Sequence, residues 1–321
     1  MTRVLVTTSW LSPGDQVHKL LANAGHEVVH SSFRDDRDLT RLVAGFDGIV
    51  AGTDPFDADV IAAADRLRVL GRTGVGYDNI DVAAATRHGV AVCPTPGVNR
   101  QSVAEHTVAM ILNCARLIPQ NIAGVRAGDW PQVSGRELHG STLGLIGLGA
   151  IGKAVARIAL GFGMTVVAYD PFLDTGFAAE HGIRGVPLPE LLATSDFVSL
   201  HIFLDETTRH LIDARAISTM KDGAYLVNTA RGGVIDERAL GEALAGGKLA
   251  GAALDVLETE PLAPDSPLRA LDNLLITAHI GAATVESRAR SGMMAAQSVI
   301  DVLAGRIPSH TVNPEFVEGE Y

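Results

Sequence analysis

The sequence predicts an α/β protein with two parallel sheets, and three observations support this. Short β-branched runs alternate with helix-like segments from end to end, which is typical of βαβ units. The apolar runs lack strict apolar–polar alternation, as expected where helices cover both faces of a sheet. The length of 321 residues, at about 150 residues per domain, indicates roughly two domains.

The elements follow one another in two sets. In the first half the expected strands are Val4–Thr8, Val28–His30, Gly48–Ala51, Arg68–Leu70 and Ala91–Cys93, with helix-like segments such as Gly14–Ala24 and Asp57–Ala64 between them. In the second half they are Leu143–Ile146, Thr165–Tyr169, Phe197–Leu200, Tyr225–Asn228, Gly251–Asp255 and Leu274–Thr277. A long helical pattern at Asn99–Leu117 separates the sets, and another at Glu286–Leu303 follows the last strand.

Composition excludes several classes of protein. The formal net charge is −11 and no Lys/Arg run occurs, which disfavours binding to nucleic acid or to an anionic membrane surface. Cys93 and Cys114 form no CxxC pair, so neither a disulfide framework nor a metal site is expected. The first residues read as a strand rather than a signal sequence, and the longest stretch without charged residues, 138–152, is glycine-rich and too short to span a membrane. We therefore expect a cytoplasmic protein.

A dinucleotide site is predicted in the second half. The strand Leu143–Ile146 leads into Gly147, Gly149 and Gly152 with G-x-G-x-x-G spacing, and a helical pattern follows. These glycines permit a tight turn, approach of a pyrophosphate to the backbone, and close helix–strand packing. Asp170, at the end of the next strand, can accept hydrogen bonds from ribose hydroxyls.

The residues around Asp170 favour NAD over NADP. Its carboxylate would repel a 2′-phosphate, and Pro171 and Phe172 provide no cation to bind one. The alternative is that the glycines are ordinary packing turns and the acid is accidental.

Catalytic candidates come from the rule that ligands bind at the carboxyl ends of strands in an open α/β sheet. His201 and His279 each follow an apolar strand, as do Arg231 and Asp255, and Glu260 comes shortly after Asp255. Each has a structural alternative: a hydrogen-bonded core histidine, a surface ion pair or a loop glutamate. For His201 the structural role is favoured.

As a set, these residues resemble the D-2-hydroxyacid dehydrogenases, nearest to the phosphoglycerate dehydrogenase branch. The similar segments run from Val4 to Pro314 and include Gly74-Val75-Gly76-Tyr77-Asp78-Asn79-Ile80-Asp81, Ser102-Val103-Ala104-Glu105-His106-Thr107, Thr229-Ala230-Arg231-Gly232-Gly233, Ala253-Leu254-Asp255-Val256, Glu260-Pro261 and His279-Ile280-Gly281-Ala282-Ala283-Thr284. The resemblance implies transfer of a hydride between NADH and a 2-oxo acid.

The resemblance also implies residue roles. His279 would be the general acid and base, Glu260 its partner, and Arg231 the group that binds the substrate carboxylate and polarises the carbonyl. The implied substrate-binding set is Arg72, Val75, Gly76, Arg231 and His279. The implied cofactor-binding set is Gly147, Gly149, Ala150, Ile151, Gly152, Asp170, Thr107, Thr229, Ala230, Arg231, Asp255, His279 and Gly281.

The implied architecture is a Rossmann NAD-binding domain inserted into a flavodoxin-like substrate domain. The substrate domain would comprise residues 1–98 and 290–321, and the NAD-binding domain residues 99–289. The segment Asn99–Gly140, with Trp130, would build a homodimer. An ordinary amphipathic surface is the alternative for that segment.

The substrate stays open among 2-oxo acids. Arg72 matches a phosphate-binding position of phosphoglycerate dehydrogenases, but around Ala51-Gly52-Thr53-Asp54-Pro55, where the family often carries a further arginine, there is no cation and Asp54 adds a negative charge. We also expect no extra C-terminal regulatory domain of the kind that longer family members carry. Hydroxypyruvate, glyoxylate or phosphonopyruvate reduction is therefore the alternative to phosphoglycerate oxidation. Formate dehydrogenase is disfavoured because Glu260 is present. An alternative from another class is a non-enzymatic NAD sensor resembling the C-terminal binding protein corepressors.

Overall fold

A computed structural model describes residues 1–31 and 38–319. The chain divides into two compact units: unit 1 comprises Met1–Asn99 and Thr284–Tyr321, and unit 2 comprises Arg100–Ala283. The chain returns from unit 2 to unit 1 at Thr284, earlier than the expected residue 290. The reason is that the whole of the long helix α12 (Val285–Leu303) packs against α1, β3 and β4 of unit 1. The division into a substrate domain and a cofactor domain as such stays a prediction.

Unit 1 is built on a five-stranded parallel sheet. The strands are β1 (Arg3–Val6), β2 (Glu27–His30), β3 (Gly48–Ala51), β4 (Val69–Arg72) and β5 (Ala91–Cys93), in the order β2-β1-β3-β4-β5. This is the strand order of flavodoxin-like sheets. The strands are almost wholly apolar because helices cover both faces.

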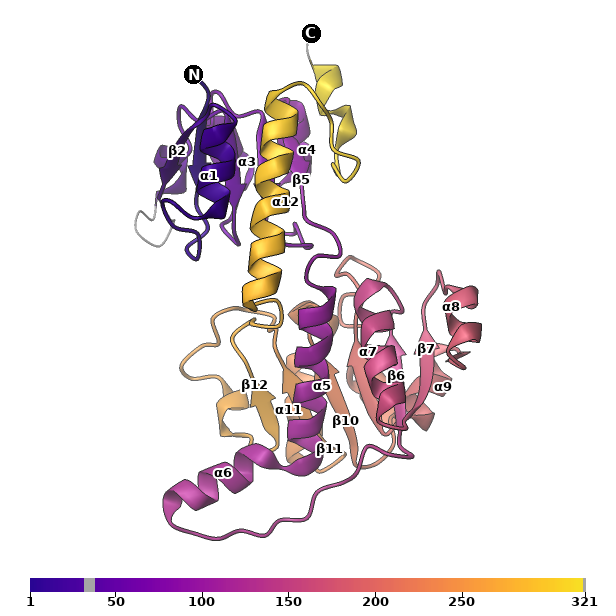
Figure 1. The fold of residues 1–321 in the computed structure, drawn as a ribbon. Helices are drawn as coiled ribbons and strands as arrows, with labels where there is room; N and C mark the ends of the chain where they lie inside the picture. The colour runs from indigo at the N-terminus through magenta and orange to yellow at the C-terminus, as the bar shows by residue number, and fades with distance from the viewer. Residues whose placement is uncertain (32–37, 320–321) are drawn as a thin grey trace. The chain divides into compact units, whose positions relative to one another are not determined.

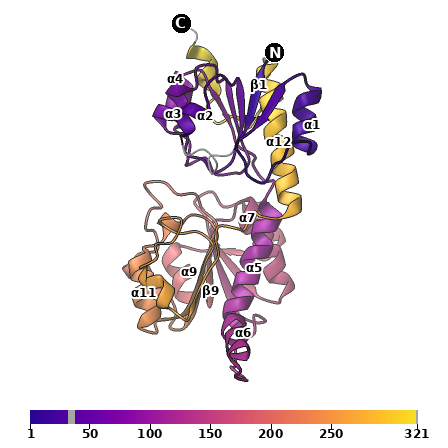
Figure 2. The same cartoon turned by 90° about the vertical axis from the view of Figure 1, so that its left-hand side faces the viewer.

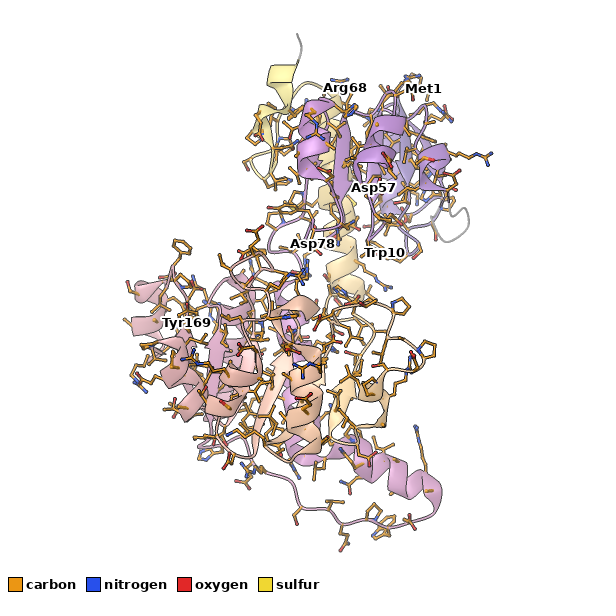
Figure 3. The ribbon with its side chains drawn as sticks, turned by 180° about the vertical axis from the view of Figure 1, so that it is seen from behind. Met1, Trp10, Asp57, Arg68, Asp78 and Tyr169 are labelled. Carbon is orange, nitrogen blue, oxygen red and sulfur yellow. The ribbon has the colours of Figure 1, made fainter. Side chains whose placement is uncertain are left out.

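Two helical layers enclose the sheet of unit 1 (Figure 2). Helices α1 (Gln16–Asn23) and α12 pack on one face, where Val17, Leu21 and Val299 join the strand residues in one core. Helices α2 (Leu39–Leu42), α3 (Ala58–Ala63) and α4 (Val82–Arg87) pack on the other. A 3₁₀ segment, Pro314–Gly319, packs beside α4. Trp10 follows β1, at the carboxyl edge of the sheet (Figure 3), and the Arg288 guanidinium of α12 lies 5.7 Å from its ring centre.

Unit 2 contains a seven-stranded parallel sheet (Figure 1). Its strands are β6 (Thr142–Ile146), β7 (Thr165–Tyr169), β8 (Arg184–Gly185), β9 (Phe197–Leu200), β10 (Ala224–Asn228), β11 (Leu249–Leu254) and β12 (Leu274–Ile276), in the order β12-β11-β10-β9-β6-β7-β8. The strand order reverses between β6 and β9. Such a switch point is where doubly wound sheets bind their ligands.

Helices cover both faces of this sheet as well. Helices α5 (Arg100–Arg116), α7 (Ala150–Gly161) and α8 (Thr175–Glu180) contribute to the core on one face. Helices α9 (Leu188–Thr194), α10 (Ala214–Thr219) and α11 (Glu237–Ala245) contribute to the core on the other. Two short 3₁₀ segments, Gly232–Val234 and Pro267–Ala270, complete the unit. The predicted fold class, two doubly wound parallel-sheet units, is confirmed.

Helix α6 (Ile118–Ala127) extends from the end of α5 and has no buried residue. No single helix in the described ranges is long and apolar enough to cross a membrane. Within those ranges, only α5 and α6 taken together have the length and composition of a membrane span, and the two helices are bent by 61° relative to each other. Half of α5 is buried in the core of unit 2, as in a core helix, with Met110 and Ile111 among its most enclosed side chains.

Candidate active site

The side chains of His279 and Glu260 form a hydrogen-bonded pair in unit 2. His279 follows β12, and its Nδ1 lies 2.9 Å from Oε2 of Glu260. The other carboxylate oxygen of Glu260 accepts a hydrogen bond from the Leu257 amide at 3.1 Å. With Nδ1 held by Glu260, Nε2 is the ring nitrogen that can exchange a proton with a ligand.

The charge of Glu260 suits this pairing. Burial works to raise the pKa of Glu260, but the hydrogen bond and charge of His279 and the Leu257 amide outweigh it, and the pKa is lowered. Glu260 therefore stays ionised at neutral pH. The ionised carboxylate accepts the hydrogen bond from Nδ1 of His279.

Asp255 fixes the backbone on both sides of His279. Its carbonyl oxygen accepts from the His279 amide at 2.8 Å, and its two carboxylate oxygens accept from the Ile280 and Gly281 amides, each at 2.8 Å. His279 has a φ of 53°, in the left-handed region that residues with a side chain seldom adopt. Such a conformation persists when the surroundings hold it, and Asp255 supplies three of the bonds that do so.

Asp255 is almost completely buried, at 2% exposure. Desolvation works to raise its pKa, but hydrogen bonds from His106, Thr277 and the two loop amides outweigh it and hold the pKa at about 2. The carboxylate is therefore charged at every physiological pH. Sequence reasoning assigned no role to His106 or Thr277; the only available signals were the motif that contains His106 and the position of Thr277 after a strand.

Arg231 lies in the loop after β10, and Asn228 supports that loop. The Asn228 amide nitrogen donates to the Arg231 carbonyl at 2.8 Å, and its amide oxygen accepts from the Ala230 backbone at 3.0 Å. A Cβ on Gly232 would lie 1.9 Å from the carbonyl carbon of Leu257, so only glycine allows this close approach. The Arg231 loop is thus packed against the backbone that leads to Glu260.

Arg231, Asp255 and His279 follow three neighbouring parallel strands, β10, β11 and β12. Strand ends in a sheet are about 4.8 Å apart, which places the chain beyond β10 and beyond β12 about 10 Å from each other. That span accommodates a three-carbon acid between an arginine and a histidine.

The glycine-rich turn fits a dinucleotide. Gly147 has a φ of 95°, and a Cβ there would meet the His201 carbonyl oxygen at 2.5 Å, whereas a Cβ on Gly149 would meet nothing within 4 Å. Gly149 therefore faces open space through which a pyrophosphate can approach the backbone. A Cβ on Gly152 would lie 2.2 Å from the Gly147 carbonyl oxygen, so the glycine lets helix and turn pack closely.

Helix α7 begins differently from most other helices of the chain. Within residues 1–31 and 38–319, Asp side chains cap seven helices, at Asp15, Asp38, Asp57, Asp81, Asp174, Asp213 and Asp236. Helix α7 starts after Gly149, and no side chain among the described residues caps it. Ala150 is exposed and Ile151 is half-buried. The amides of this first turn, at the positive end of the helix, are therefore available to an anion.

Asp170 lies beside this turn. Its Oδ2 accepts from the Leu148 amide and its Oδ1 from the Phe172 amide, both at 2.8 Å. Each carboxylate oxygen keeps acceptor capacity for a ribose hydroxyl. The two backbone bonds fix the carboxylate at the carboxyl ends of β6 and β7, where the adenosine end of a dinucleotide is expected.

His201 differs from His279 although both follow strands. Its Nε2 is 3.0 Å from the Ser199 hydroxyl, and burial lowers the pKa of His201 to about 3. The ring is therefore neutral at physiological pH and unsuited to act as an acid. This agrees with the structural role favoured for it by the sequence.

The remaining predicted site residues are distributed over both units. Thr107 is completely buried, and its hydroxyl contacts the Val103 carbonyl and the Thr229 hydroxyl, each at 2.8 Å. In unit 1, Arg72 ends β4, and Val75 and Gly76 follow it half-buried. The roles of these residues in binding stay predictions.

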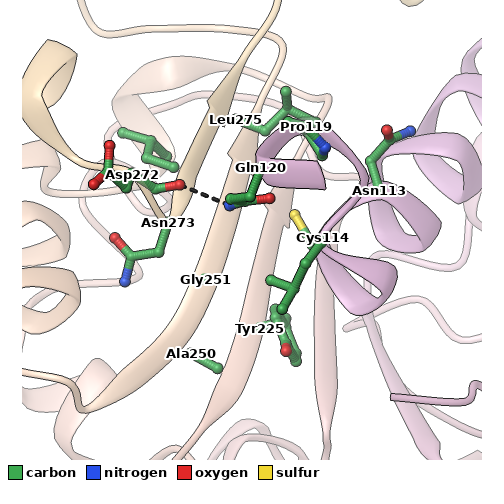
Figure 4. Close-up of a pocket in the computed structure, with 12 residues that line it drawn as sticks. Asn113, Cys114, Pro119, Gln120, Tyr225, Ala250, Gly251, Asp272, Asn273 and Leu275 are labelled. Atoms are coloured by element: carbon green, nitrogen blue, oxygen red, sulfur yellow. Dashed lines mark hydrogen bonds between the residues drawn. The ribbon is translucent and has the colours of Figure 1, made fainter. Parts of the chain in front are cut away.

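A pocket opens at the opposite, amino-terminal ends of β10 to β12 (Figure 4). It is lined by residues of α5, the start of α6 and these strands, and Gln120 donates across it to the Asp272 carbonyl at 2.7 Å. Burial raises the pKa of the Cys114 thiol to about 12, so Cys114 stays protonated there. The pocket is thus separate from the catalytic candidates.

Residues 108–281 match the family described as D-isomer specific 2-hydroxyacid dehydrogenase, NAD binding domain. This chain belongs to the D-isomer specific 2-hydroxyacid dehydrogenases. The predicted family, enzyme class and NAD cofactor of this dehydrogenase are therefore confirmed.

Relatives with different substrates are similar to this dehydrogenase. It is 44% identical to glyoxylate reductase of Korarchaeum cryptofilum over 83% of this chain and 82% of that protein. It is 41% identical to hydroxypyruvate reductase of Thermotoga maritima over 89% of this chain and 94% of that protein. It is 42% identical to D-3-phosphoglycerate dehydrogenase of Archaeoglobus fulgidus over 92% of this chain, but spans only 56% of that protein.

A solved structure extends the comparison. D-lactate dehydrogenase of Aquifex aeolicus, complexed with NAD and lactic acid, is 32% identical, covers 95% of this chain and 96% of its own, and superimposes with a TM-score of 0.83. The family therefore contains members with this fold and several different acids as substrates.

Proposed function

We propose that this dehydrogenase reduces a small, unphosphorylated 2-oxo acid of the glyoxylate or hydroxypyruvate class, with NADH as the electron donor. The observation that carries the proposal is the 2.9 Å contact between His279 and Glu260 at the same sheet edge as Arg231. A general acid, its carboxylate partner and a cation are the groups that reduction of a 2-oxo acid requires.

Arg231, His279 and Glu260 each have a separate role in the proposed reduction. NADH supplies the hydride that adds to C2 of the oxo acid. Arg231 binds the substrate carboxylate and polarises the carbonyl. His279 donates the proton from Nε2 to the carbonyl oxygen, and Glu260 stabilises the imidazolium before transfer and holds the ring in one orientation afterwards. In the reverse direction the same ring removes the hydroxyl proton.

Charge in unit 1 supports an unphosphorylated substrate. Asp54 follows β3, and its carboxylate is hydrogen-bonded by the Thr7 hydroxyl and the Gly52 amide at the carboxyl edge of that sheet. A fixed negative charge at this edge opposes a phosphate dianion. Arg72, at the end of the neighbouring strand β4, favours one instead and makes phosphohydroxypyruvate the second candidate.

A panel assay tests the proposal. Purified protein and NADH are mixed with glyoxylate, hydroxypyruvate, pyruvate, a branched oxo acid, phosphohydroxypyruvate and phosphonopyruvate, and loss of NADH absorbance is followed. We expect the highest kcat/KM with glyoxylate or hydroxypyruvate. A preference of more than tenfold for phosphohydroxypyruvate or phosphonopyruvate would assign Arg72 to an anionic tail and overturn the unphosphorylated substrate.

We also infer that the chain forms a homodimer through α6 and the segment after it. Ile122, Val125 and Trp130 are 47%, 51% and 78% exposed, which is unusual for large apolar side chains in sequence proximity. A second copy would cover them. Trp130→Glu should shift sedimentation from dimer to monomer; a wild-type chain that sediments as a monomer at micromolar concentration would refute the inference.

A further inference from the structure

Helix α5 contacts the loop of His279 through His106. The Nε2 atom of His106 lies 3.2 Å from Oδ1 of Asp255 and 3.2 Å from the Thr277 hydroxyl oxygen. Because a carboxylate only accepts hydrogen bonds, Nε2 carries the proton and donates it. Thr277 in turn donates to the same oxygen of Asp255 at 2.6 Å. The side chain of His106 is 18% exposed, so water competes little for this contact.

The donors to Asp255 come from two parts of unit 2. Thr277, Ile280 and Gly281 all lie in the segment that also carries His279. His106 is a donor from outside that segment. It therefore connects the carboxylate to α5, a long helix that packs on α7 and on strands β10 and β11.

The position of the carboxylate determines the backbone around His279. Ile280 and Gly281, the two residues after His279, each donate to it, and a Cβ on Gly281 would lie 2.9 Å from Asp255 Oδ2 and 3.5 Å from the His106 ring. Loop, carboxylate and imidazole are thus in close contact. A rotation of the carboxylate would lengthen the hydrogen bonds that stabilise the left-handed backbone of His279.

The next residue of α5 reaches the other catalytic loop. The Thr107 hydroxyl lies 2.8 Å from the hydroxyl of Thr229, two residues before Arg231. Consecutive residues of one helix therefore contact the loop of Arg231 and the loop of His279. This makes α5 a common support for both.

We propose that His106 is a positioning residue, which orients the Asp255 carboxylate and thereby the loop that presents His279 to the substrate. The inference rests on the proposed function for the role of His279, but the contact itself does not. His106 takes no proton from the substrate. Its contribution is the N–H that it donates to Asp255.

Two substitutions separate the N–H from the bulk of the ring. His106→Leu fills similar space without a donor, whereas His106→Gln retains an N–H at the position of Nε2. The matched control is His181→Leu. His181 is 19% exposed in the same unit, and it stacks on Phe177 at the end of α8, near the opposite edge of the sheet.

Two measurements are made on the full chain, in the oligomeric state in which it is purified. Steady-state kinetics with the best 2-oxo acid should show kcat about tenfold lower in His106→Leu, because a hydrogen bond to a buried charge is lost, with KM changed by less than about threefold. His106→Gln should recover most of this loss. Amide hydrogen exchange should be faster at Ile280 and Gly281 in His106→Leu, and unchanged there in His181→Leu.

Each outcome supports or overturns the role of His106 as a positioning residue. Equal kcat losses in His106→Leu and His106→Gln, or unchanged exchange at Ile280 and Gly281 in His106→Leu, would overturn the proposal. If the wild-type chain reduces no 2-oxo acid, the proposed function fails, while faster exchange at these two amides still supports His106 as the residue that fixes the loop. If His106→Leu does not fold, exchange in His106→Gln decides: wild-type protection supports the donor role and lost protection overturns it.

Discussion

His279 donates its backbone amide to the carbonyl oxygen of Asp255 at 2.8 Å, so the strand end of β11 holds the residue that follows β12. The Asp255 carboxylate binds the next two amides as well. Three consecutive backbone amides of the loop that carries His279 are thereby hydrogen-bonded to one residue, Asp255.

Asp255 makes the stability of the chain pH-dependent. Its pKa is about 2 in the folded chain against an ordinary value of 3.8, so its stabilising contribution is present in full above about pH 5 and is lost as pH falls towards 2. The shift corresponds to about 2 kcal/mol. Chemical denaturation measures the free energy of unfolding at each pH. Between pH 6 and pH 3 this free energy should fall in the wild type, and it should fall less in Asp255→Asn. An equal fall with pH in the two proteins would contradict this.

Gly232 is predicted to tolerate no side chain. Gly232→Ala places a Cβ within 1.9 Å of the Leu257 backbone, which should cost about 1–3 kcal/mol and displace the Arg231 loop. The control is Gly241→Ala, inside α11, where the Cβ meets only Leu268 at 3.5 Å and should stabilise the helix by up to about 1 kcal/mol. Thermal unfolding measures both. If Gly232→Ala were as stable as Gly241→Ala, the Arg231 loop would not be in contact with the backbone at Leu257.

Asp170 should determine the choice between NAD and NADP. Asp170→Ala removes the acceptor for the ribose hydroxyls and the charge that repels a 2′-phosphate, so NADH should bind about tenfold or more weakly and NADPH better. Fluorescence titration with each nucleotide gives the ratio of dissociation constants. An unchanged ratio would exclude Asp170 from the ribose site.

Arg231 should be irreplaceable by another cation. Arg231→Lys retains the charge but loses the planar pair of donors that fits a carboxylate, so we expect kcat/KM for the oxo acid to fall about a hundredfold or more. NADH affinity, measured in the absence of oxo acid, serves as the control and should change much less. Near-normal kcat/KM in Arg231→Lys would assign carboxylate binding to another residue.

Much of the fold follows from the sequence because β-branched strand runs and helical patterns are local signals. The strands Gly48–Ala51, Thr165–Tyr169 and Phe197–Leu200 have the predicted bounds. Strand β8 was missed, since Arg184–Gly185 is a two-residue edge strand without an apolar run. A segment this short carries no periodicity to detect.

The site was predictable only in part. The strand-end rule selects Arg231, Asp255 and His279, whose backbone positions follow from the sheet. The contact between His279 and Glu260 depends on the path of an irregular loop, and the one between His106 and Asp255 depends on the rotation of α5 over the sheet. Neither path nor rotation is encoded in a local pattern, so a helical histidine such as His106 gives no signal of its own.

The most direct test of the account compares the wild type with His279→Gln in the presence of NADH and the best 2-oxo acid. Single-turnover oxidation of bound NADH should be slower in the variant by about 10²–10⁴-fold, because the proton donor is lost, while the dissociation constant for NADH stays within about threefold of the wild-type value. A variant that turns over at the wild-type rate would contradict His279 as the general acid, and with it the central claim of the mechanism.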